Sequence, residues 1–217
     1  MEFDSYFIRH AESEGNAGLA SDDPSTIPLT ARGKLQAETL AASFAISPAI
    51  IVSSPYQRAR ETAMPLLARF PSAQRISLPI QEFTYLAPAS WRGTNGAQRR
   101  PAVEAYWERC DPSFCDGAEA ESFADFFKRI EGCLSWLSYK ATRPIVLVCH
   151  EMFIRGVIWR CFSPSLTHAI STMSAFRVWQ LATKLPNVSI TRVTCFKDGS
   201  VAIVSPFAFA VETPNRQ

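Results

Sequence analysis

Short runs of hydrophobic residues alternate along the chain with longer segments in which hydrophobic positions recur every three or four residues. Short apolar runs between turn-forming residues are typical of buried strands, and the longer spacing is typical of helices with one buried face. The runs predict strands at residues 6–8, 49–52, 75–80, 144–149, 176–182, 188–196 and 201–204. The spaced segments predict helices at residues 31–44, 101–109, 122–139 and 151–161, and a further helix that begins at residue 54. This alternation indicates an α/β fold.

The helix that begins at residue 54 has a recognisable start signal. Ser54 is a favourable N-cap residue, Pro55 would occupy the first helical position, and Gln57 would complete a capping box. This start places Arg58 in the first turn of the helix, above the C-terminal end of the preceding strand. Because the helix dipole is positive there, we expect this position to favour an anion.

The segment from residue 81 to about 118 departs from the regular pattern. It contains Glu82, several aromatic residues and turn formers, and three arginines, Arg92, Arg99 and Arg100. Long irregular segments within compact domains commonly bind ligands. We therefore predict a substrate-loop insertion here, in which the three arginines either border the substrate site or face solvent.

Length and composition limit the class of protein. A chain of 217 residues, 47% of them hydrophobic, can bury one substantial core, so we expect a single domain over residues 1–217. The net charge of +2, without a basic run, gives no reason to expect a nucleic-acid partner. The six cysteines lack CxxC spacing and the chain has only three histidines, so we expect no metal site.

Neither the start of the chain nor its most apolar region predicts membrane targeting. Residues 1–4 are acidic and lack the cationic and apolar segments of a secretory signal. Residues 145–159 are the most apolar, but they include His150, Glu151 and Arg155 and are too few to span a bilayer. We therefore expect a cytoplasmic protein without a membrane partner.

Candidate chemistry lies where predicted strands end. Arg9 and His10 follow the first predicted strand, and His150 follows the strand at 144–149 in the same way. Open α/β sheets bind ligands at the carboxyl ends of their strands, so these residues and Arg58 are expected to meet in one crevice. Arginines there would attract an anion and disfavour protonation of a nearby imidazole, and a neutral imidazole is a nucleophile.

Four motifs in this order resemble the histidine phosphatase superfamily, in the branch that includes cofactor-dependent phosphoglycerate mutases and fructose-2,6-bisphosphatases. The matching segments are RHAESEGN (9–16), PLTARGKLQA (28–37), SSPYQRARETA (53–63) and VCH (148–150). The resemblance is good over about residues 5–63 and 144–160, and it extends through the middle of the chain only at Glu82. It implies a three-layer sandwich with a mostly parallel central sheet flanked by helices.

The resemblance also implies roles for individual residues. His10 would attack phosphorus and form a phosphohistidine, while Arg9, Arg58 and His150 would bind the phosphoryl oxygens and Asn16 would add a hydrogen bond. Such a site needs no metal and no cofactor, because two guanidinium groups and an imidazolium can neutralise the transferred charge. The substrate would be a small-molecule or peptide-borne phosphate ester.

Glu82 stands in a position similar to that of the family's acid. In that role it would protonate the leaving oxygen and then activate the attacking water. The alternative is a solvated loop carboxylate. The other carboxylate near the first motif, Glu12, is placed by that motif beside the pocket rather than above it.

The chain departs from the family pattern after each histidine, with Ala11 and Glu151 where glycine is usual. Ala11 is a small change. Glu151 brings a carboxylate to the edge of the expected pocket, where it would repel a phosphate. Because the buried face of the helix at 151–161 includes Ile154 and Val157, we expect the Glu151 side chain to point away from the pocket, along the packed side of the helix.

Three functions are compatible with the motifs. The leading one is a phosphomonoesterase. The second is a phosphoglycerate-type mutase, but residues 83–86 are uncharged where mutases of this family carry an arginine-rich stretch. The third is a non-catalytic phosphate-binding module, which the presence of all the motif residues disfavours.

Overall fold

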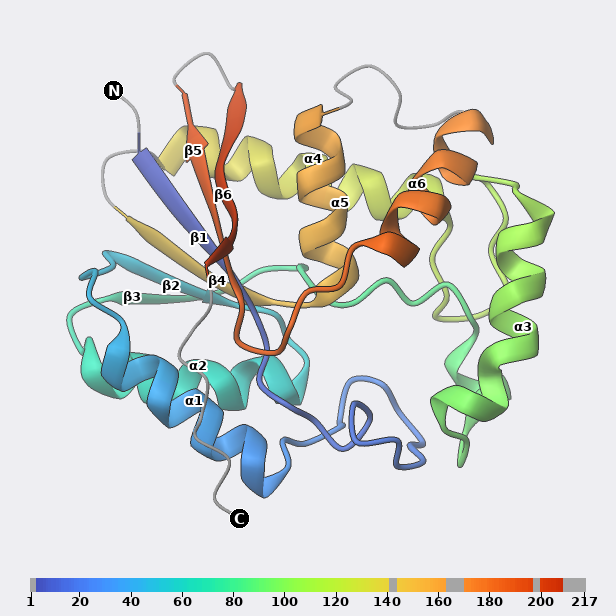
Figure 1. Ribbon diagram of the computed structural model, residues 1–217, viewed down its shortest axis with the longest axis horizontal. Coiled ribbons are helices and arrows are strands. Elements are labelled where there is room, and N and C mark those ends of the chain that lie inside the picture. Colours follow the sequence, from blue (N-terminus) through green and yellow to red (C-terminus); the bar gives the residue numbers. More distant parts are fainter. Residues whose placement is uncertain (1–2, 141–143, 163–169, 197–199, 209–217) are drawn as a thin grey trace.

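The computed structural model describes residues 3–140, 144–162, 170–196 and 200–208, and its centre is a six-stranded sheet (Figure 1). The strand order is β3-β2-β4-β1-β5-β6. The bounds are β1 (Phe3–Arg9), β2 (Ile50–Ser53), β3 (Gln74–Ser77), β4 (Ile145–Cys149), β5 (Ile190–Cys195) and β6 (Val201–Ala208). The first four strands of this order pair in parallel, and β5 and β6 extend the sheet in antiparallel pairs. The expected mostly parallel sheet is confirmed.

Helices cover both faces of the sheet, which confirms the three-layer architecture (Figure 1). The bounds are α1 (Ala31–Ser43), α2 (Gln57–Arg69), α3 (Gly96–Arg109), α4 (Phe123–Lys140), α5 (Glu151–Phe162) and α6 (Ile170–Ala182), with a short 3-10 helix η1 (Pro88–Trp91). Apolar residues of α1 and α2 pack in one core cluster with Ile8 and Val148, whereas those of α4, α5 and α6 pack in the other with Phe7 and Leu147. Successive residues of β1 and β4 thus face opposite layers, as a pleated strand requires.

The helix predicted at 122–139 is present as α4, and its buried face, rich in phenylalanine, packs in the core cluster on its side of the sheet. Phe123, Phe126, Phe127, Ile130 and Leu137 are fully buried. Burial of each such side chain contributes about 1.5–3 kcal/mol. This layer supports the C-terminal ends of β1 and β4 from one side.

Two elements predicted from the sequence need correction. Residues 176–182, predicted as a strand, lie within α6, because burial there follows helical spacing: Met173, Phe176 and Gln180 are buried, whereas Val178 is 71% exposed. The helix expected at 101–109 begins five residues earlier, at Gly96. Residues 197–199, between the strands predicted at 188–196 and 201–204, lie outside the described residues.

The predicted capping box at the start of α2 is wrong. The helix begins at Gln57 with Tyr56 as its N-cap, and no side chain caps it. The Ser54 hydroxyl accepts a hydrogen bond from the Tyr56 backbone N–H at 3.2 Å and contacts His150 at 2.8 Å. Ser54 therefore connects β2 to the end of β4 instead of capping a helix.

The segment between β3 and α4 carries η1 and α3 and lies to one side of the sheet (Figure 1). Asn95 and Gln98 form a reciprocal capping box at the start of α3, which fixes the direction in which this helix leaves the preceding loop. Within the described ranges, no helix combines the length and the apolar character that crossing a membrane requires.

Candidate active site

The ends of two neighbouring parallel strands bring the two histidines together. Arg9 and Cys149 are register partners at the ends of β1 and β4, and the His10 backbone N–H donates to the Cys149 carbonyl at 2.9 Å. The two imidazole centroids lie 5.0 Å apart, with His10 2% exposed and His150 fully buried. The predicted convergence of the two histidines is thus present in the structure.

The contacts of His10 define which of its nitrogens carries the proton. Nε2 accepts a hydrogen bond from Nε of Arg58 at 3.1 Å, because a guanidinium can only donate. Nδ1 lies 2.7 Å from the Ala11 carbonyl, which can only accept, so Nδ1 carries the proton. Burial and the charges of Arg58 and Arg9 lower the pKa of His10 well below its usual range. His10 is therefore a neutral imidazole with its lone pair on Nε2.

Arg58 reaches His10 from the first turn of α2, as the sequence predicted. Its side chain is buried, its Nη1 donates to the Pro24 carbonyl at 2.6 Å, and its guanidinium lies 5.0 Å from the Tyr56 ring centroid. Thr62, one helical turn later, accepts a hydrogen bond from the Ala11 N–H at 3.0 Å and so joins α2 to the segment after His10. The Pro24 carbonyl thus holds the Arg58 guanidinium, while Thr62 fixes α2 next to the segment that carries His10.

His150 has one partnered nitrogen. Its Nε2 lies 2.8 Å from the Ser54 hydroxyl, and among the described residues its buried Nδ1 has no hydrogen-bond partner. Burial and the nearby charge of Arg58 lower the pKa of His150 well below its usual range. An unpartnered buried nitrogen costs free energy unless a ligand satisfies it. No local pattern predicts this role of Ser54, because the two residues in contact are 96 positions apart.

Glu82 lies at the N-terminus of α5. Its Oε1 accepts hydrogen bonds from the backbone N–H groups of Met152, at 3.0 Å, and of Phe83, at 3.2 Å. Burial raises the pKa of Glu82 from its usual range, although the charge of Arg58 opposes that rise. The predicted acid is therefore next to the predicted phosphate site, as a carboxyl group that holds its proton more readily than usual.

Arg129 of α4 holds the backbone next to Glu82. Its Nη1 donates to the carbonyls of Gln81, at 2.8 Å, and Pro79, at 3.0 Å. Its Nε and Nη2 pair with the carboxylate of Glu121. Arg129 could not be predicted as part of the site, since no local pattern connects it to a segment almost fifty residues earlier.

Arg9 differs from Arg58 in where its guanidinium is held. Its Nη2 pairs with Glu151 Oε2 at 3.0 Å and its Nη1 donates to the Leu185 carbonyl. Glu151 also pairs with Arg155 and accepts a hydrogen bond from the Leu185 N–H at 3.2 Å. The buried Nε of Arg9 has no partner among the described residues. The sequence did not predict that Glu151 would bind one of the expected phosphate ligands.

The loop after His10 is tied down by backbone and amide contacts. Asn187 donates through Nδ2 to the His10 carbonyl at 2.9 Å and to Oδ1 of Asn16, itself exposed, at 3.1 Å. Gly33 allows α1 to approach the loop, because a Cβ atom there would lie 2.0 Å from the Glu12 carbonyl oxygen. The Glu12 carboxylate accepts from Thr30 at 2.8 Å, which directs it to the start of α1.

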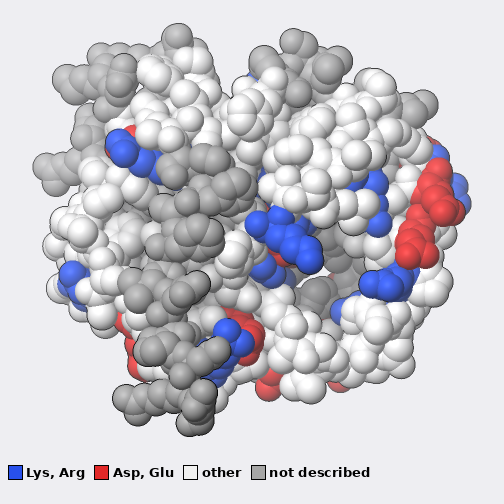
Figure 2. Space-filling model, in the orientation of Figure 1, with Lys and Arg blue, Asp and Glu red and all other residues white. Residues whose placement is uncertain are grey.

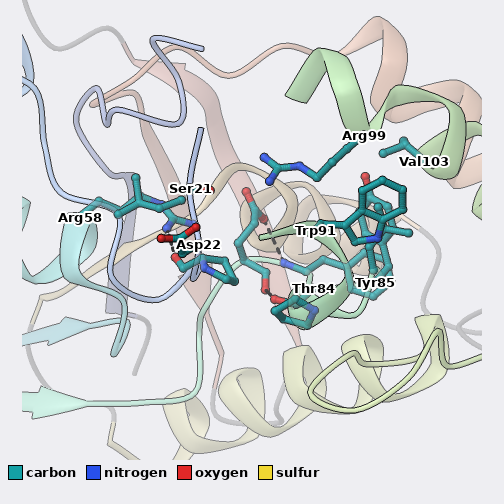
Figure 3. Close-up of a pocket in the computed structure, with 14 residues that line it drawn as sticks. Ser21, Asp22, Arg58, Thr84, Tyr85, Trp91, Arg99 and Val103 are labelled. Carbon is teal, nitrogen blue, oxygen red and sulfur yellow. Dashed lines mark hydrogen bonds between the residues drawn. The ribbon is translucent and has the colours of Figure 1, made fainter. Parts of the chain in front are cut away.

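Of the three loop arginines, the structure brings Arg99 to the site. Arg99 lines the same cavity as Arg58 and Glu82, and the side chains drawn in Figure 3 surround that cavity. Arg92 is exposed and borders a neighbouring depression, and Arg100 is exposed and lines none of the cavities described here. Figure 2 shows a hollow in the face seen in Figure 1, with Lys and Arg side chains on its rim.

The charge of the site favours an anion. Two histidines and two arginines meet at the strand ends, and in the described part of the chain no three His, Cys, Asp or Glu side chains group as ligands for a metal ion. A buried neutral imidazole, a guanidinium next to it, and a carboxyl group of raised pKa can perform nucleophilic attack, charge neutralisation and proton transfer, respectively.

Comparison with known proteins identifies one family. The model of the histidine phosphatase superfamily (branch 1) matches residues 5–205. No curated protein matches the chain by sequence.

Solved structures share the fold at low sequence identity. A mycobacterial glucosyl-3-phosphoglycerate phosphatase aligns with a TM-score of 0.69 and 21% identity, over 94% of this chain and 98% of its own. A phosphoserine phosphatase from Entamoeba histolytica, in complex with 3-phosphoglyceric acid, aligns with a TM-score of 0.70 and 20% identity, over 95% and 98%. A protein described as mycobacterial hydrolase 1 aligns with a TM-score of 0.71 and 22% identity, over 96% and 99%.

Proposed function

The chain belongs to the histidine phosphatase superfamily, branch 1, and from this premise we propose that it is a metal-independent phosphomonoesterase that acts through a phosphohistidine intermediate. Its substrate would be a small-molecule or peptide-borne phosphate ester. The observation that carries the proposal is the state of His10. It is a buried neutral imidazole with its lone pair on Nε2, and this nitrogen lies 3.1 Å from Nε of Arg58. A substrate phosphoryl group placed between them would meet both a nucleophile and a cation.

In the first step, Nε2 of His10 attacks phosphorus and the bond between phosphorus and the ester oxygen breaks. The Arg58 N–H that now contacts Nε2 would transfer its hydrogen bond to a phosphoryl oxygen. The Nδ1–H of His10, bonded to the Ala11 carbonyl, stabilises the positive charge that develops on the ring. Glu82 donates its proton to the leaving oxygen, which departs as an alcohol.

Two unpartnered nitrogens would complete the binding of the phosphoryl oxygens. Where the Ser54 hydroxyl donates to Nε2 of His150, Nδ1 carries the ring proton and can donate it to the substrate. The buried Nε of Arg9 can donate without breaking the ion pair with Glu151. Such donors are most effective when they are fixed before the reaction and shielded from water.

In the second step, water attacks the phosphohistidine. Glu82, now ionised, removes a proton from the water, the bond between phosphorus and Nε2 breaks, and its electron pair returns to the imidazole. Inorganic phosphate leaves and Glu82 is protonated again, so that the site is restored. The mutase alternative is not favoured, because the cavity wall after Glu82 is formed mainly by apolar and aromatic side chains.

Rapid quenching with radiolabelled p-nitrophenyl phosphate, in the presence of a metal chelator, tests this proposal. We expect a protein-bound label that is lost in acid and retained in base, located on His10 and absent from the His10→Ala variant. His10→Ala should also abolish phosphate release. Label on a serine or cysteine, or phosphate release that the chelator stops, would contradict the proposal.

A further inference from the structure

A cavity of about 180 Å³ lies next to the proposed phosphate site, and Arg58 and Glu82 are among the residues that line it. Figure 3 shows the side chains around this cavity. Arg58 lies at one side of it. Trp91, Tyr85 and Val103 line the opposite side, and the Arg99 side chain extends over the space between. Because Glu82 would protonate the leaving oxygen, this cavity is where the alcohol part of a substrate would lie.

The wall formed by Tyr85 is rigid. The Tyr85 ring centroid lies 4.8 Å from that of Tyr106 and 5.1 Å from that of Phe83. Phe83 in turn stacks on Phe126 of the core with its ring centroid 4.4 Å away. Aromatic contacts of this kind hold ring orientations, so the cavity is formed before a ligand enters and binding there costs little reorganisation.

The charges around the cavity do not favour a second anionic group. Arg58 would be neutralised by the substrate phosphate itself. Apart from Arg58, the lining carries one basic side chain, Arg99, and two acidic side chains, Asp22 and Glu82, so it has no excess of positive charge. A compact substrate with an additional carboxylate or phosphate would therefore gain little from this side of the site.

We propose that the substrate is the phosphate ester of an alcohol that carries an aromatic ring, and that this ring binds against Trp91 and Tyr85. The inference rests on the proposed function, since it assigns the leaving-group side of that site. The cavity volume, about 180 Å³, is close to that of an engineered apolar cavity of roughly 150 Å³ that binds benzene. The indole N–H of Trp91 is buried and has no partner among the described residues. It can donate to a polar atom on the ring.

A pair of alkyl esters isolates the ring from the reactivity of phosphorus. In 2-phenylethyl phosphate and propyl phosphate the leaving groups are both primary alcohols, so the difference in their kcat/KM reports binding of the ring. We expect at least a tenfold preference for the phenyl ester, since an apolar pocket discriminates by about 10–200-fold for each small group. Trp91→Ala should reduce this preference to less than threefold, and Trp91→Phe should retain most of it.

Trp136 of α4 provides a matched control. It is also partly buried, but it packs against the core and lines none of the cavities described here. Trp136→Ala should leave the preference between the two esters unchanged. Thermal unfolding of all three variants identifies any that are not folded. If Trp91→Ala is not folded, the ester preference of Trp91→Phe is compared with that of the unaltered protein instead.

A binding measurement separates failure of this inference from failure of the proposed function. Calorimetric titration with 3-phenylpropylphosphonate and butylphosphonate, which cannot be hydrolysed, should give at least a tenfold lower Kd for the phenyl compound, in the unaltered protein and in His10→Ala. Equal Kd values, or a preference that Trp91→Ala leaves intact, would overturn the inference even if phosphatase activity is present. A retained preference without phosphate release would overturn the proposed function alone.

Discussion

The two arginines beside His10 are held in opposite environments. Arg58 is buried against the imidazole, and its other contacts are a carbonyl and an aromatic ring, so no ion pair among the described residues offsets its charge. Arg9 is adjacent in sequence to His10, yet its guanidinium pairs with Glu151 and is 13% exposed. An uncompensated cation attracts a phosphate more strongly than one already paired with a carboxylate. The comparison indicates that Arg58 supplies most of the charge that binds phosphate.

The cavities next to the two arginines also differ in the chemical character of their lining. The cavity on the Arg58 side has an aromatic wall, whereas the depression on the Arg9 side is lined by Arg155, Lys184 and Glu151. Glu82 belongs to the first of these. The proposed chemistry therefore lies on one side of His10, and the ion-pair network on the other side has a supporting role. The following predictions test that division.

The largest effect is expected at Glu82. Glu82→Gln should lower kcat/KM for alkyl phosphates by about 10²–10⁴-fold, because general acid catalysis contributes that much. The loss for p-nitrophenyl phosphate should be much smaller, since p-nitrophenolate leaves without a proton. For alkyl esters, activity requires the protonated carboxyl group, whose pKa is raised. Activity should therefore fall as pH rises through that pKa, and this limb should be absent from the variant.

The control for this prediction is Glu104→Gln, which removes an exposed carboxylate of α3. It should leave the activity toward both classes of ester and the pH profile unchanged. Equal losses on alkyl and aryl esters in Glu82→Gln would show that the carboxyl group binds substrate without acting as the acid.

The second prediction compares the two arginines directly. Arg58→Ala should lower kcat/KM by about 10²–10³-fold, as removal of one preorganised donor to a developing charge does. Arg9→Ala should lower it by less, on the order of tenfold, because Arg9 is already paired with a carboxylate, that of Glu151. Arg60→Ala, an exposed neighbour on α2, serves as the control. Losses of the same size in Arg58→Ala and Arg9→Ala would contradict the division between the two sides.

The histidines and Arg58 could be predicted from the sequence because each depends on local pattern. Strand ends at His10 and His150 are visible in the apolar runs, and parallel pairing then places them side by side. Ser54 shows where local rules fail. Its surroundings in the sequence fit a capping box, but in the structure its hydroxyl contacts His150, at the end of the neighbouring strand. Which of the three loop arginines reaches the cavity depends on the direction of α3. That direction is set by a capping box that lies several residues before the helix start expected from the sequence.

The third prediction concerns Ser54, which acts on the reaction through His150. Ser54→Ala should lower kcat/KM by about five- to tenfold, equivalent to the roughly 1 kcal/mol net contribution of one hydrogen bond. Nitrogen-15 NMR of the His150 ring should show the change of tautomer or ring orientation that a merely local loss of packing would not cause. Ser54→Thr, which keeps the hydroxyl, should restore the NMR signature. An unchanged His150 spectrum in Ser54→Ala would remove Ser54 from the site.

The smallest effect is expected from Glu151→Gln. Two consequences oppose each other: the variant removes a negative charge near the phosphate, and it loosens Arg9, which the Leu185 carbonyl then holds alone. Because Glu151 is neutralised by two arginines, we expect the net change in kcat/KM to stay below about tenfold, or 1.4 kcal/mol. KM should fall and kcat should change little, since the released charge of Arg9 strengthens ground-state binding of the anion.

The matched control is Glu131→Gln, which removes the carboxylate paired with Arg160 at the other end of α5. It breaks a Glu–Arg pair without approaching the strand ends, so neither KM nor kcat should change. An increase in kcat/KM of more than tenfold in Glu151→Gln would mean that the carboxylate restrains phosphate binding directly. The side of Arg9 would then contribute to catalysis as much as the side of Arg58, and the contrast between them would not hold.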